Sequence, residues 1–338
     1  MRAPEFWTTG AGPWPYLLAP LGCLYAATGK LERRLTRPHK APVPVICVGN
    51  LTAGGTGKTP VALKLARLLA ARGSAPGFVT RGYGGQARGP LAVDPETHDA
   101  TTVGDEALLL AASAPTWLAE KRRLAVPLMI AAGCDHLILD DGHQDPALVK
   151  DVSLVVVDGE TGFGNGRCIP AGPLREPVAD GLARAQAVIV MGEDRTGLAA
   201  RVESLHPGLP VLEAWLAPDA AASELKGRRV FAFAGIGRPD KFRATLEEIG
   251  VDLQGFRAFA DHHRYGAEEI EELLGTATAL DAAAVTTAKD HVRLPEDVQA
   301  QVLVVGVEAA FADEPRLLGL IEAGVSASAA PTAPDRDG

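Results

Sequence analysis

Apolar and polar positions follow two alternating patterns along the chain. Short runs rich in β-branched and other apolar residues predict buried strands, and the stretches between several of them show the spacing of helices. The predicted strands are 43–48, 77–80, 134–139, 152–157, 187–191, 229–234, 282–287 and 302–307. Repeated alternation of strands with helices is typical of an α/β fold, in which helices cover both faces of a parallel sheet.

A glycine-rich segment follows the first predicted strand and precedes a helical pattern. Residues 49–59 are Gly-Asn-Leu-Thr-Ala-Gly-Gly-Thr-Gly-Lys-Thr, and Pro60 follows near the expected start of the helix. Because glycines let backbone N–H groups converge on phosphate oxygens, the segment predicts an ATP-binding P-loop. Its predicted nucleotide contacts are Thr52, Gly54, Gly55, Thr56, Gly57, Lys58 and Thr59. Thr52 stands where the usual motif has glycine, so an ordinary strand-to-helix turn is the alternative.

Two carboxylates follow the apolar run that ends at residue 139. Asp140 and Asp141 are therefore expected at the same sheet edge as the glycine-rich loop. Mg²⁺ prefers oxygen ligands, so we predict that Asp140, Asp141 and the Thr59 hydroxyl hold Mg²⁺ beside ATP. The alternative is a capped turn without a metal.

Other polar residues at the ends of predicted elements are candidates for ligand contacts. Arg81 follows a strand within a glycine-rich turn, and Asp105 begins a helix. Because the helix dipole stabilises an acid there, Asp105 is either a cap or a base near a transferred phosphoryl group. The segment 259–265 contains an Asp-His-His sequence, which suits proton transfer better than metal binding because further ligands at fixed spacing are not obvious.

Two segments of the second half leave alternatives open. Residues 235–241 resemble a second phosphate-binding turn that lacks Lys-Thr, or they form a tight strand–helix connection. Lys289 and Asp290 follow a predicted strand, and they either brace the site across the fold or pair with each other.

Composition narrows the class of protein. The chain is 47% hydrophobic and 22% charged, which is typical of a globular protein. A formal net charge of −9 and an aromatic content of 5% argue against nucleic-acid binding. The four cysteines are widely spaced and form no Cys-x-x-Cys pair, which indicates reduced thiols in the cytosol and no zinc site.

The N-terminal segment combines an apolar stretch at 7–28 with a basic stretch that follows it. Prolines at 13, 15 and 20 interrupt the apolar stretch, so it does not match a helix that spans a bilayer. Trp and Tyr beside an apolar helix, followed by Lys and Arg, suit a segment that lies in the headgroup layer of an anionic membrane. An amphipathic helix packed on the protein's own core is the alternative.

The length of 338 residues predicts two main domains and two flanking segments. We expect an apolar and basic membrane-associating segment at 1–40, a P-loop domain at 41–222 and a smaller α/β domain at 223–325. Residues 326–338 are rich in Ala, Pro, Ser and Asp and predict a disordered tail.

The order of these segments resembles the lipid A disaccharide 4′-kinase family, also called tetraacyldisaccharide 4′-kinases. The resemblance extends from the N-terminal apolar segment to about residue 323, and Thr52 agrees with the loop of this family. It is carried by 48–60, 81–84, 103–106, 140–142, 170–176, 233–237, 261–263 and 286–287. The chain departs from the family at Ala107, where proline is expected, at His143, where an apolar residue is commoner, and at Ala288, where an acid is expected.

The resemblance implies transfer of the ATP γ-phosphoryl group to the 4′-hydroxyl of a tetraacylated glucosamine disaccharide 1-phosphate, which forms lipid IVA. It also implies that Asp105 is the base and that His262, from the second domain, is its partner. The candidate substrate contacts are Asn50, Arg81, Tyr83, Arg175 and Glu176.

The same resemblance implies a peripheral or monotopic protein at the cytoplasmic face of the bacterial inner membrane. Its partners are then a lipid precursor in the bilayer and the anionic membrane surface, with no obligate protein partner. The alternatives are a P-loop kinase for a soluble small molecule and a nucleotide-hydrolysing switch protein. The chain lacks the Asn-Lys-x-Asp motif with which guanine-binding switches recognise their base.

Overall fold

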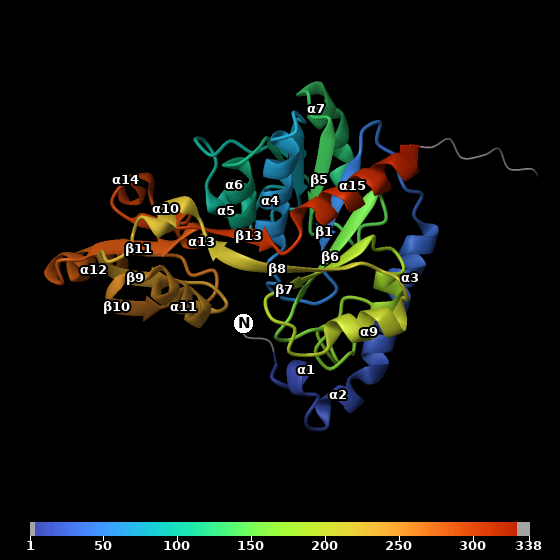
Figure 1. Ribbon diagram of the computed structural model, residues 1–338, viewed down its shortest axis with the longest axis horizontal. Helices are drawn as coiled ribbons and strands as arrows, with labels where there is room; N and C mark the ends of the chain where they lie inside the picture. Colours follow the sequence, from blue (N-terminus) through green and yellow to red (C-terminus); the bar gives the residue numbers. More distant parts are fainter. Residues whose placement is uncertain (1–3, 330–338) are drawn as a thin grey trace, which may run out of the picture.

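The computed structural model describes residues 4–329, which form two α/β units and an N-terminal group of helices (Figure 1). The first unit contains a nine-stranded sheet in the order β13-β8-β7-β6-β1-β5-β2-β4-β3. Its strands are β1 (Val45–Gly49), β2 (Pro76–Thr80), β3 (Leu91–Ala92), β4 (Thr116–Leu118), β5 (His136–Asp140), β6 (Val152–Asp158), β7 (Ala187–Met191), β8 (Val211–Pro218) and β13 (Val307–Phe311).

Helices cover both faces of this sheet, as the apolar pattern predicts. They are α4 (Lys58–Ala70), α5 (Ala100–Val103), α6 (Asp105–Ala111), a 3₁₀ turn (Arg122–Leu124), α7 (Val126–Ala131), α8 (Val178–Leu182), α9 (Leu198–Leu205) and α15 (Glu314–Ala329). Alternate residues of β1 belong to different cores: Ile46 and Val48 pack with α4, whereas Val45 and Cys47 pack with α7. All five residues of β1 are buried, which explains its continuous apolar run.

The register of the central strands places the candidate chemistry at one edge. β1 pairs in parallel with β5 and β6, so Val48 lies opposite Asp140 and Gly49 lies opposite Val155. The loop after β1 and the acids after β5 therefore share the carboxyl edge of the sheet, where ligands bind in open α/β folds. The sheet is not wholly parallel, because the edge strands β3 and β13 run antiparallel to their neighbours.

The second unit is a smaller parallel sheet in the order β10-β9-β11-β12 (Figure 1, left). Its strands are β9 (Arg229–Ala234), β10 (Asp252–Ala258), β11 (Ala283–Thr287) and β12 (Leu303–Val305). Its helices are α10 (Ala220–Ser223), α11 (Pro239–Ile249), α12 (Ala267–Ala279), α13 (Ala288–His291) and α14 (Glu296–Gln299). Two small cores lie on the two faces of this sheet, one with α11 and the other with α12.

The predicted boundary of the second domain at residue 325 is wrong. The predicted strand 302–307 is divided between β12 and the start of β13, and β13 returns to the first sheet beside β8. Leu317 and Ile321 of α15 belong to the main core of the first unit. The apolar spacing predicts a strand and a helix here, but it cannot show which sheet they join. Residues 326–329 are helical, and the rest of the predicted tail lies outside the described residues.

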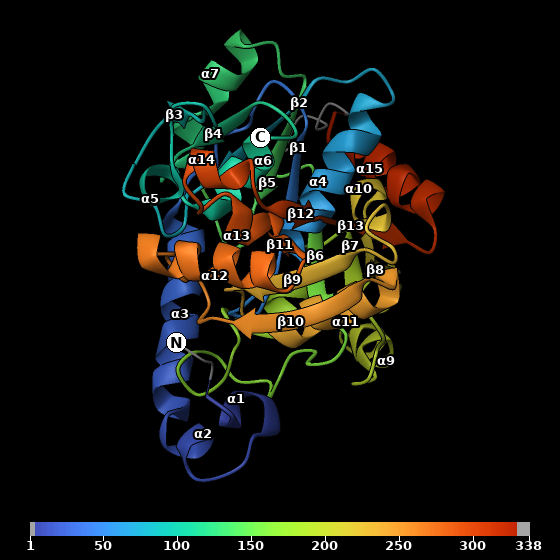
Figure 2. The ribbon, with the colours of Figure 1, turned by 90° about the vertical axis from the view of Figure 1, so that its left-hand side faces the viewer.

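The N-terminal segment forms α1 (Phe6–Thr9), α2 (Trp14–Leu17) and α3 (Ala19–Leu35), which extend along the first unit (Figure 2). Proline stands in the first turn of α2 and of α3, where its missing N–H costs little, so two of the three prolines begin helices. Gly22 is the one buried residue of α3. The described part of the chain contains no helix whose length and apolarity suffice to cross a bilayer.

Candidate active site

The glycine-rich loop connects β1 to α4, as predicted. Gly54 and Gly57 have positive φ angles of 113° and 85°, which other residues rarely adopt, and α4 begins at Lys58. Asn50 is fully buried, and its Nδ2 donates hydrogen bonds to Thr52 O at 2.7 Å and Thr56 Oγ1 at 3.3 Å. These bonds hold the loop from inside, and the predicted contact between Asn50 and the substrate stays a prediction.

The Lys58 ammonium lies beside the second of the two acids that follow β5. Its Nζ is 3.8 Å from Asp141 Oδ1, and Arg175 Nη1 approaches the same oxygen at 2.7 Å. Burial lowers the pKa of Lys58, and Asp141 opposes that effect. For Asp141, the two cations outweigh the effect of burial and lower its pKa. Lys58, Asp141 and Arg175 therefore form one charged cluster at the mouth of the loop.

Asp140 has a different environment from its neighbour. It is buried, and its Oδ1 lacks a hydrogen-bond partner among the described residues. Burial and the adjacent charge of Asp141 raise its pKa to about 7. Arg122, itself fully buried, donates to the carbonyl oxygens of Asp140 at 3.0 Å and Asp141 at 2.8 Å, which holds the turn. A buried carboxylate oxygen without a hydrogen-bond partner is a suitable ligand for a hard cation.

The predicted Asp105–His262 pair is a contact between the two units. Asp105 is the first residue of α6, and His262 follows β10 in the second unit. His262 Nδ1 lies 2.9 Å from Asp105 Oδ2. The two residues are 157 positions apart in the sequence, so only the packing of the two units brings them together.

Sequence reasoning missed Arg293, which is the third member of this contact. Its Nε lies 2.9 Å from Asp105 Oδ2, and its Nη2 contacts the same oxygen. Burial raises the pKa of Asp105, but the hydrogen bonds from His262 and Arg293 outweigh it and lower the pKa to about 2. The one available signal was the nearby Lys289-Asp290 pair, whose partners the sequence leaves open.

Lys289 and Asp290 do not pair with each other. Lys289 Nζ lies 2.7 Å from Glu106 Oε1 across the two units, whereas Asp290 is fully buried in the second unit. Adjacent acids at the start of α6, Asp105 and Glu106, thus meet cations from one short segment, 289–293. This arrangement agrees with the cross-bracing alternative.

The other candidate substrate contacts differ in accessibility. Arg81 is exposed, and Tyr83 is 78% exposed with its ring centroid 6.3 Å from that of His262. Arg175 is part of the charged cluster with Asp141. Glu176 is only 1% exposed, so direct contact with a substrate would require loss of its present partners. Those partners are Arg184 at 2.7 Å, Gln144 at 3.0 Å and Arg33 of α3 at 3.3 Å.

The second glycine turn, 235–241, also faces the first unit. Arg238 Nη1 lies 3.1 Å from Asp158 Oδ2 and 3.0 Å from Glu160 Oε2, and Lys241 Nζ lies 3.4 Å from the same Asp158 oxygen. Asp158 ends β6, which neighbours β1. The turn therefore makes a second set of ion pairs between the units, with the acids again on the first unit.

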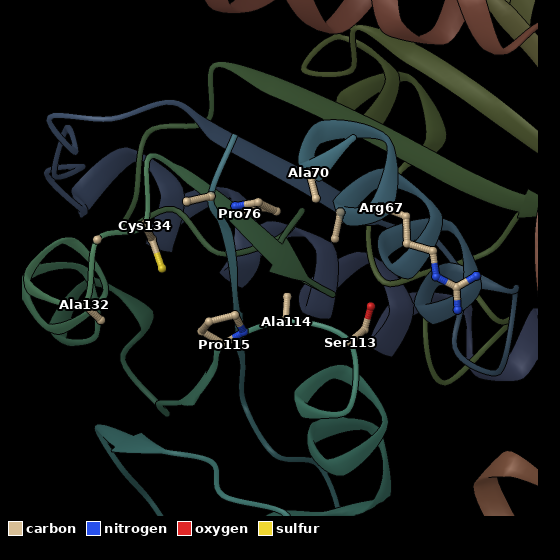
Figure 3. Close-up of a pocket in the computed structure, with 11 residues that line it drawn as sticks. Arg67, Ala70, Pro76, Ser113, Ala114, Pro115, Ala132 and Cys134 are labelled. Atoms are coloured by element: carbon tan, nitrogen blue, oxygen red, sulfur yellow. The ribbon is translucent and has the colours of Figure 1, made fainter. Parts of the chain in front are cut away.

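A pocket of about 260 Å³ lies away from these residues, at the opposite edge of the sheet (Figure 3). It is lined by the last turns of α4, by the start of β2 and by the segments that follow α6 and α7. Its lining is mostly small and apolar, and Arg67 is the charged residue among it. It lacks the converging N–H groups and carboxylates of the glycine-rich loop, so we do not assign the nucleotide to it.

The glycine-rich loop lies between a buried strand and a helix that begins with Lys-Thr, and acids at the end of a parallel strand lie beside it. This combination defines a P-loop nucleotide-binding protein. The family described as tetraacyldisaccharide-1-P 4′-kinase matches residues 14–326. The chain belongs to this family and is therefore a kinase. The family resemblance inferred from the sequence is thus confirmed.

Individual relatives agree with this assignment over almost the whole chain. The tetraacyldisaccharide 4′-kinase of Rhodospirillum centenum is 53% identical over 323 residues, which cover 94% of this chain and 95% of the relative. That of Rhodospirillum rubrum is 52% identical over 318 residues, which cover 93% and 95%. A crystal structure of LpxK from Aquifex aeolicus in complex with ATP has a TM-score of 0.73 and 26% identity, and it covers 92% of this chain and 99% of that one.

Proposed function

We propose that the protein transfers the γ-phosphoryl group of ATP to the 4′-hydroxyl of a tetraacylated glucosamine disaccharide 1-phosphate and so forms lipid IVA. The observation that carries this proposal is the contact between Asp105 and His262 at 2.9 Å, made across the units at the carboxyl edge that bears the P-loop. Family membership supports the substrate, because the relatives are named as kinases of this disaccharide.

We assign roles from the charge and position of each side chain. Lys58 and the backbone N–H groups of the loop bind the phosphates, whose charge is spread over the transferred group during the reaction. Asp105 accepts a hydrogen bond from the sugar hydroxyl, orients it and takes its proton. A carboxylate with a pKa of about 2 is a weak base, but phosphoryl transfer proceeds through a loose transition state in which the proton leaves late.

The same proposal includes Mg²⁺ as a cofactor. Asp140, with its unpartnered oxygen, and the Thr59 hydroxyl at the start of α4 are the residues that would hold it. Asp141 forms ion pairs with Arg175 and Lys58, so we assign it the role of positioning these two cations. The described residues contain no group of three or more His, Cys, Asp or Glu side chains that would hold a metal alone. That composition suits Mg²⁺ in kinases, where phosphates and waters complete the coordination.

We propose that α2 and α3 lie in the cytoplasmic surface of the inner membrane, where the acylated substrate is located. The large apolar residues of this segment point to solvent: Trp14, Tyr16, Leu17, Leu21, Leu24, Tyr25, Leu31 and Leu35 are all more than 40% exposed. Such exposure is costly in water and favours insertion into the headgroup layer. Arg33 also pairs with buried Glu176, which ties this helix to the loop that carries Arg175.

The decisive experiment measures ³²P transfer from ATP to the lipid A disaccharide precursor in mixed micelles. We expect labelled lipid with the wild-type protein and a loss of about 10²–10⁴-fold in kcat with Asp105→Asn or His262→Ala. ATP binding should persist in both variants, because neither residue belongs to the phosphate loop. If the folded, ATP-binding wild-type protein does not label the lipid, the proposed substrate is wrong.

The same assay separates the two alternatives. A kinase for a soluble acceptor would label water-soluble amino sugars in place of the lipid. A nucleotide-hydrolysing switch would release inorganic phosphate at the same rate with or without lipid. We expect phosphate release without lipid to be slow, because closure of the two units over ATP excludes water.

A further inference from the structure

Arg293 holds the carboxylate of Asp105 from the opposite unit. Its side chain is only 4% exposed, although it lies at the contact between the two units. Its Nε and Nη2 both approach Oδ2 of Asp105, the same oxygen that His262 Nδ1 contacts. Within the described residues, all donors to this carboxylate therefore go to Oδ2 and none goes to Oδ1. Oδ1 is not among the buried side-chain atoms that lack a partner in the described chain. It is therefore accessible from outside and open to a ligand.

The guanidinium is itself fixed by buried groups of the second unit. Its Nη1 donates to Asp290 Oδ1 at 3.0 Å and to Gly235 O at 2.9 Å. Asp290 Oδ1 also accepts from Tyr265 Oη at 2.9 Å and from Gly235 N at 2.9 Å, and Asp290 Oδ2 accepts from Thr287 Oγ1 at 2.6 Å. The ends of β9 and β11 thus position Arg293 before it meets Asp105. A side chain held so firmly loses little freedom when it binds its partner.

We propose that Arg293 is a positioning residue of phosphoryl transfer, which clamps Oδ2 of Asp105 and so presents Oδ1 to the acceptor hydroxyl. This inference rests on the proposed function, because it assigns a part in the same reaction. Arg293 and His262 both belong to the second unit, whereas Asp105 belongs to the first. The oriented carboxylate therefore exists only when the two units meet, and Lys289 with Glu106 closes the contact one residue further along α6.

The clamp also controls the ionisation of Asp105. Asp105 is buried, which by itself favours the neutral acid, and the hydrogen bonds from His262 and Arg293 keep it ionised. Without Arg293, the desolvation of the carboxylate is less compensated, so the pKa of Asp105 rises. A neutral Asp105 accepts the hydroxyl hydrogen bond poorly, so activity at low pH depends on the clamp.

The test compares Arg293→Met and Arg293→Lys with the wild-type protein in lipid phosphorylation. We expect kcat to fall on the order of 10²-fold in Arg293→Met, because the carboxylate is no longer oriented. The KM for ATP should change by less than about threefold, because Arg293 does not touch the phosphate loop. The acidic limb of kcat/KM should move to higher pH in Arg293→Met, and Arg293→Lys should restore part of both effects because it keeps a cation.

Arg228→Met is the matched control, since Arg228 is an exposed arginine of the same unit. It should leave kcat, the KM for ATP and the pH profile unchanged. An unchanged kcat and pH profile in Arg293→Met would overturn the inference. Equal losses of kcat and ATP affinity in both Arg293 variants would also overturn it, because they indicate a purely structural role.

A double variant provides the test if Arg293→Met does not fold. The variant that combines Arg293→Lys with Asp105→Asn should have a kcat no lower than that of Asp105→Asn alone. Lipid labelling by the wild-type protein tests the proposed function separately.

Discussion

Two adjacent aspartates at the end of β5 occupy opposite electrostatic environments. Asp140 is buried beside the charge of Asp141, and its pKa rises to about 7. Asp141 meets Lys58 from the start of α4 and Arg175 from a loop 34 residues later, and these cations lower its pKa. The amino-acid type is identical, so the difference arises only from which side chains the fold brings within reach.

His143 shows the same principle at a buried position where the family resemblance predicts an apolar residue. Its Nδ1 lies 2.7 Å from Ser153 Oγ and its Nε2 lies 3.1 Å from Gly181 O, so neutral imidazole satisfies both contacts. Burial, helped by the charge of Arg184, lowers its pKa to about 4. His143 is therefore a neutral, hydrogen-bonded side chain in the core, although its residue type departs from the expected one.

This pKa predicts how stability depends on pH. Because the unfolded chain binds a proton at His143 below about pH 6.5 and the folded chain binds it only near pH 4, the free energy of unfolding falls as pH decreases between these values. The contribution of His143 is roughly 3 kcal/mol at most. Urea unfolding of wild type and His143→Gln between pH 7 and pH 4 measures it. We expect a smaller loss of stability in His143→Gln over this range.

Surface histidines provide the control for that experiment. His39 is exposed, and its side chain has no hydrogen-bond partner among the described residues. His39→Gln should follow the wild-type pH dependence closely. Equal pH dependence of wild type and His143→Gln would contradict the assignment of His143 as a neutral core residue.

At the scale of elements, α3 is a helix whose apolar side chains do not face the protein. Gly22 is its one buried residue, and a Cβ there would lie 2.8 Å from Cys168 O. Lys30 and Arg33 further along the helix form ion pairs with the first unit. Leu21 and Leu24 flank Gly22 and are 53% and 62% exposed. The sequence left membrane binding and packing on the core open, and the exposure of these leucines favours membrane binding.

Charged substitutions on this helix should weaken membrane binding without loss of stability. Each exposed leucine that inserts into the bilayer contributes about 1.5–3 kcal/mol, so Leu21→Glu with Leu24→Glu should reduce vesicle binding by at least about 10²-fold. The measurement is co-sedimentation with vesicles of anionic phospholipid, accompanied by thermal melting. Leu128→Glu, at a 44% exposed position of α7, is the control and should bind as the wild type does. Unchanged binding in the double variant would exclude α3 as the membrane element.

At the scale of the whole molecule, the chain leaves the first unit through β8 and returns through β13. The two strands pair antiparallel at the edge of the large sheet. Ion pairs join the units, Arg293 and Lys289 with the start of α6 and Arg238 and Lys241 with the end of β6. Val292 adds an apolar contact with the small cluster around α5 and α6. An interface of this kind is weaker than a hydrophobic core, which suits units that open and close around ATP.

The position of α15 in the first unit predicts how a substitution in this helix changes the free energy of unfolding. Leu317 of α15 is 1% exposed in the core of the first unit, so Leu317→Ala should lower the free energy of unfolding by about 2–5 kcal/mol. Hydrogen exchange should then increase in α4 and β6, and it should change little in β9–β12. Leu320→Ala, at a half-buried position of the same helix, should have a smaller effect. Increased exchange confined to β9–β12 would contradict the placement of α15.

Local features of the fold and site followed directly from residue order. The glycine-rich loop, the strand before it and the helix after it depend on neighbouring residues, so apolar spacing and the clustered glycines predict them. Contacts between distant segments did not follow in this way. Arg293 is 188 positions from Asp105, and no periodicity relates them.

Residue order along this chain thus predicted the strands β1, β2, β5, β6, β7, β9 and β11, the phosphate loop and the polar residues available for chemistry, because backbone preferences and apolar spacing act over a few neighbours. It did not predict β3, β4, β8 or β10. Packing in three dimensions assigned β13 and α15 to the first sheet, buried Asn50 and Glu176, and joined Asp105 to His262 and Arg293. These outcomes depend on which apolar faces meet and which charges lose water together, and both are properties of the assembled fold.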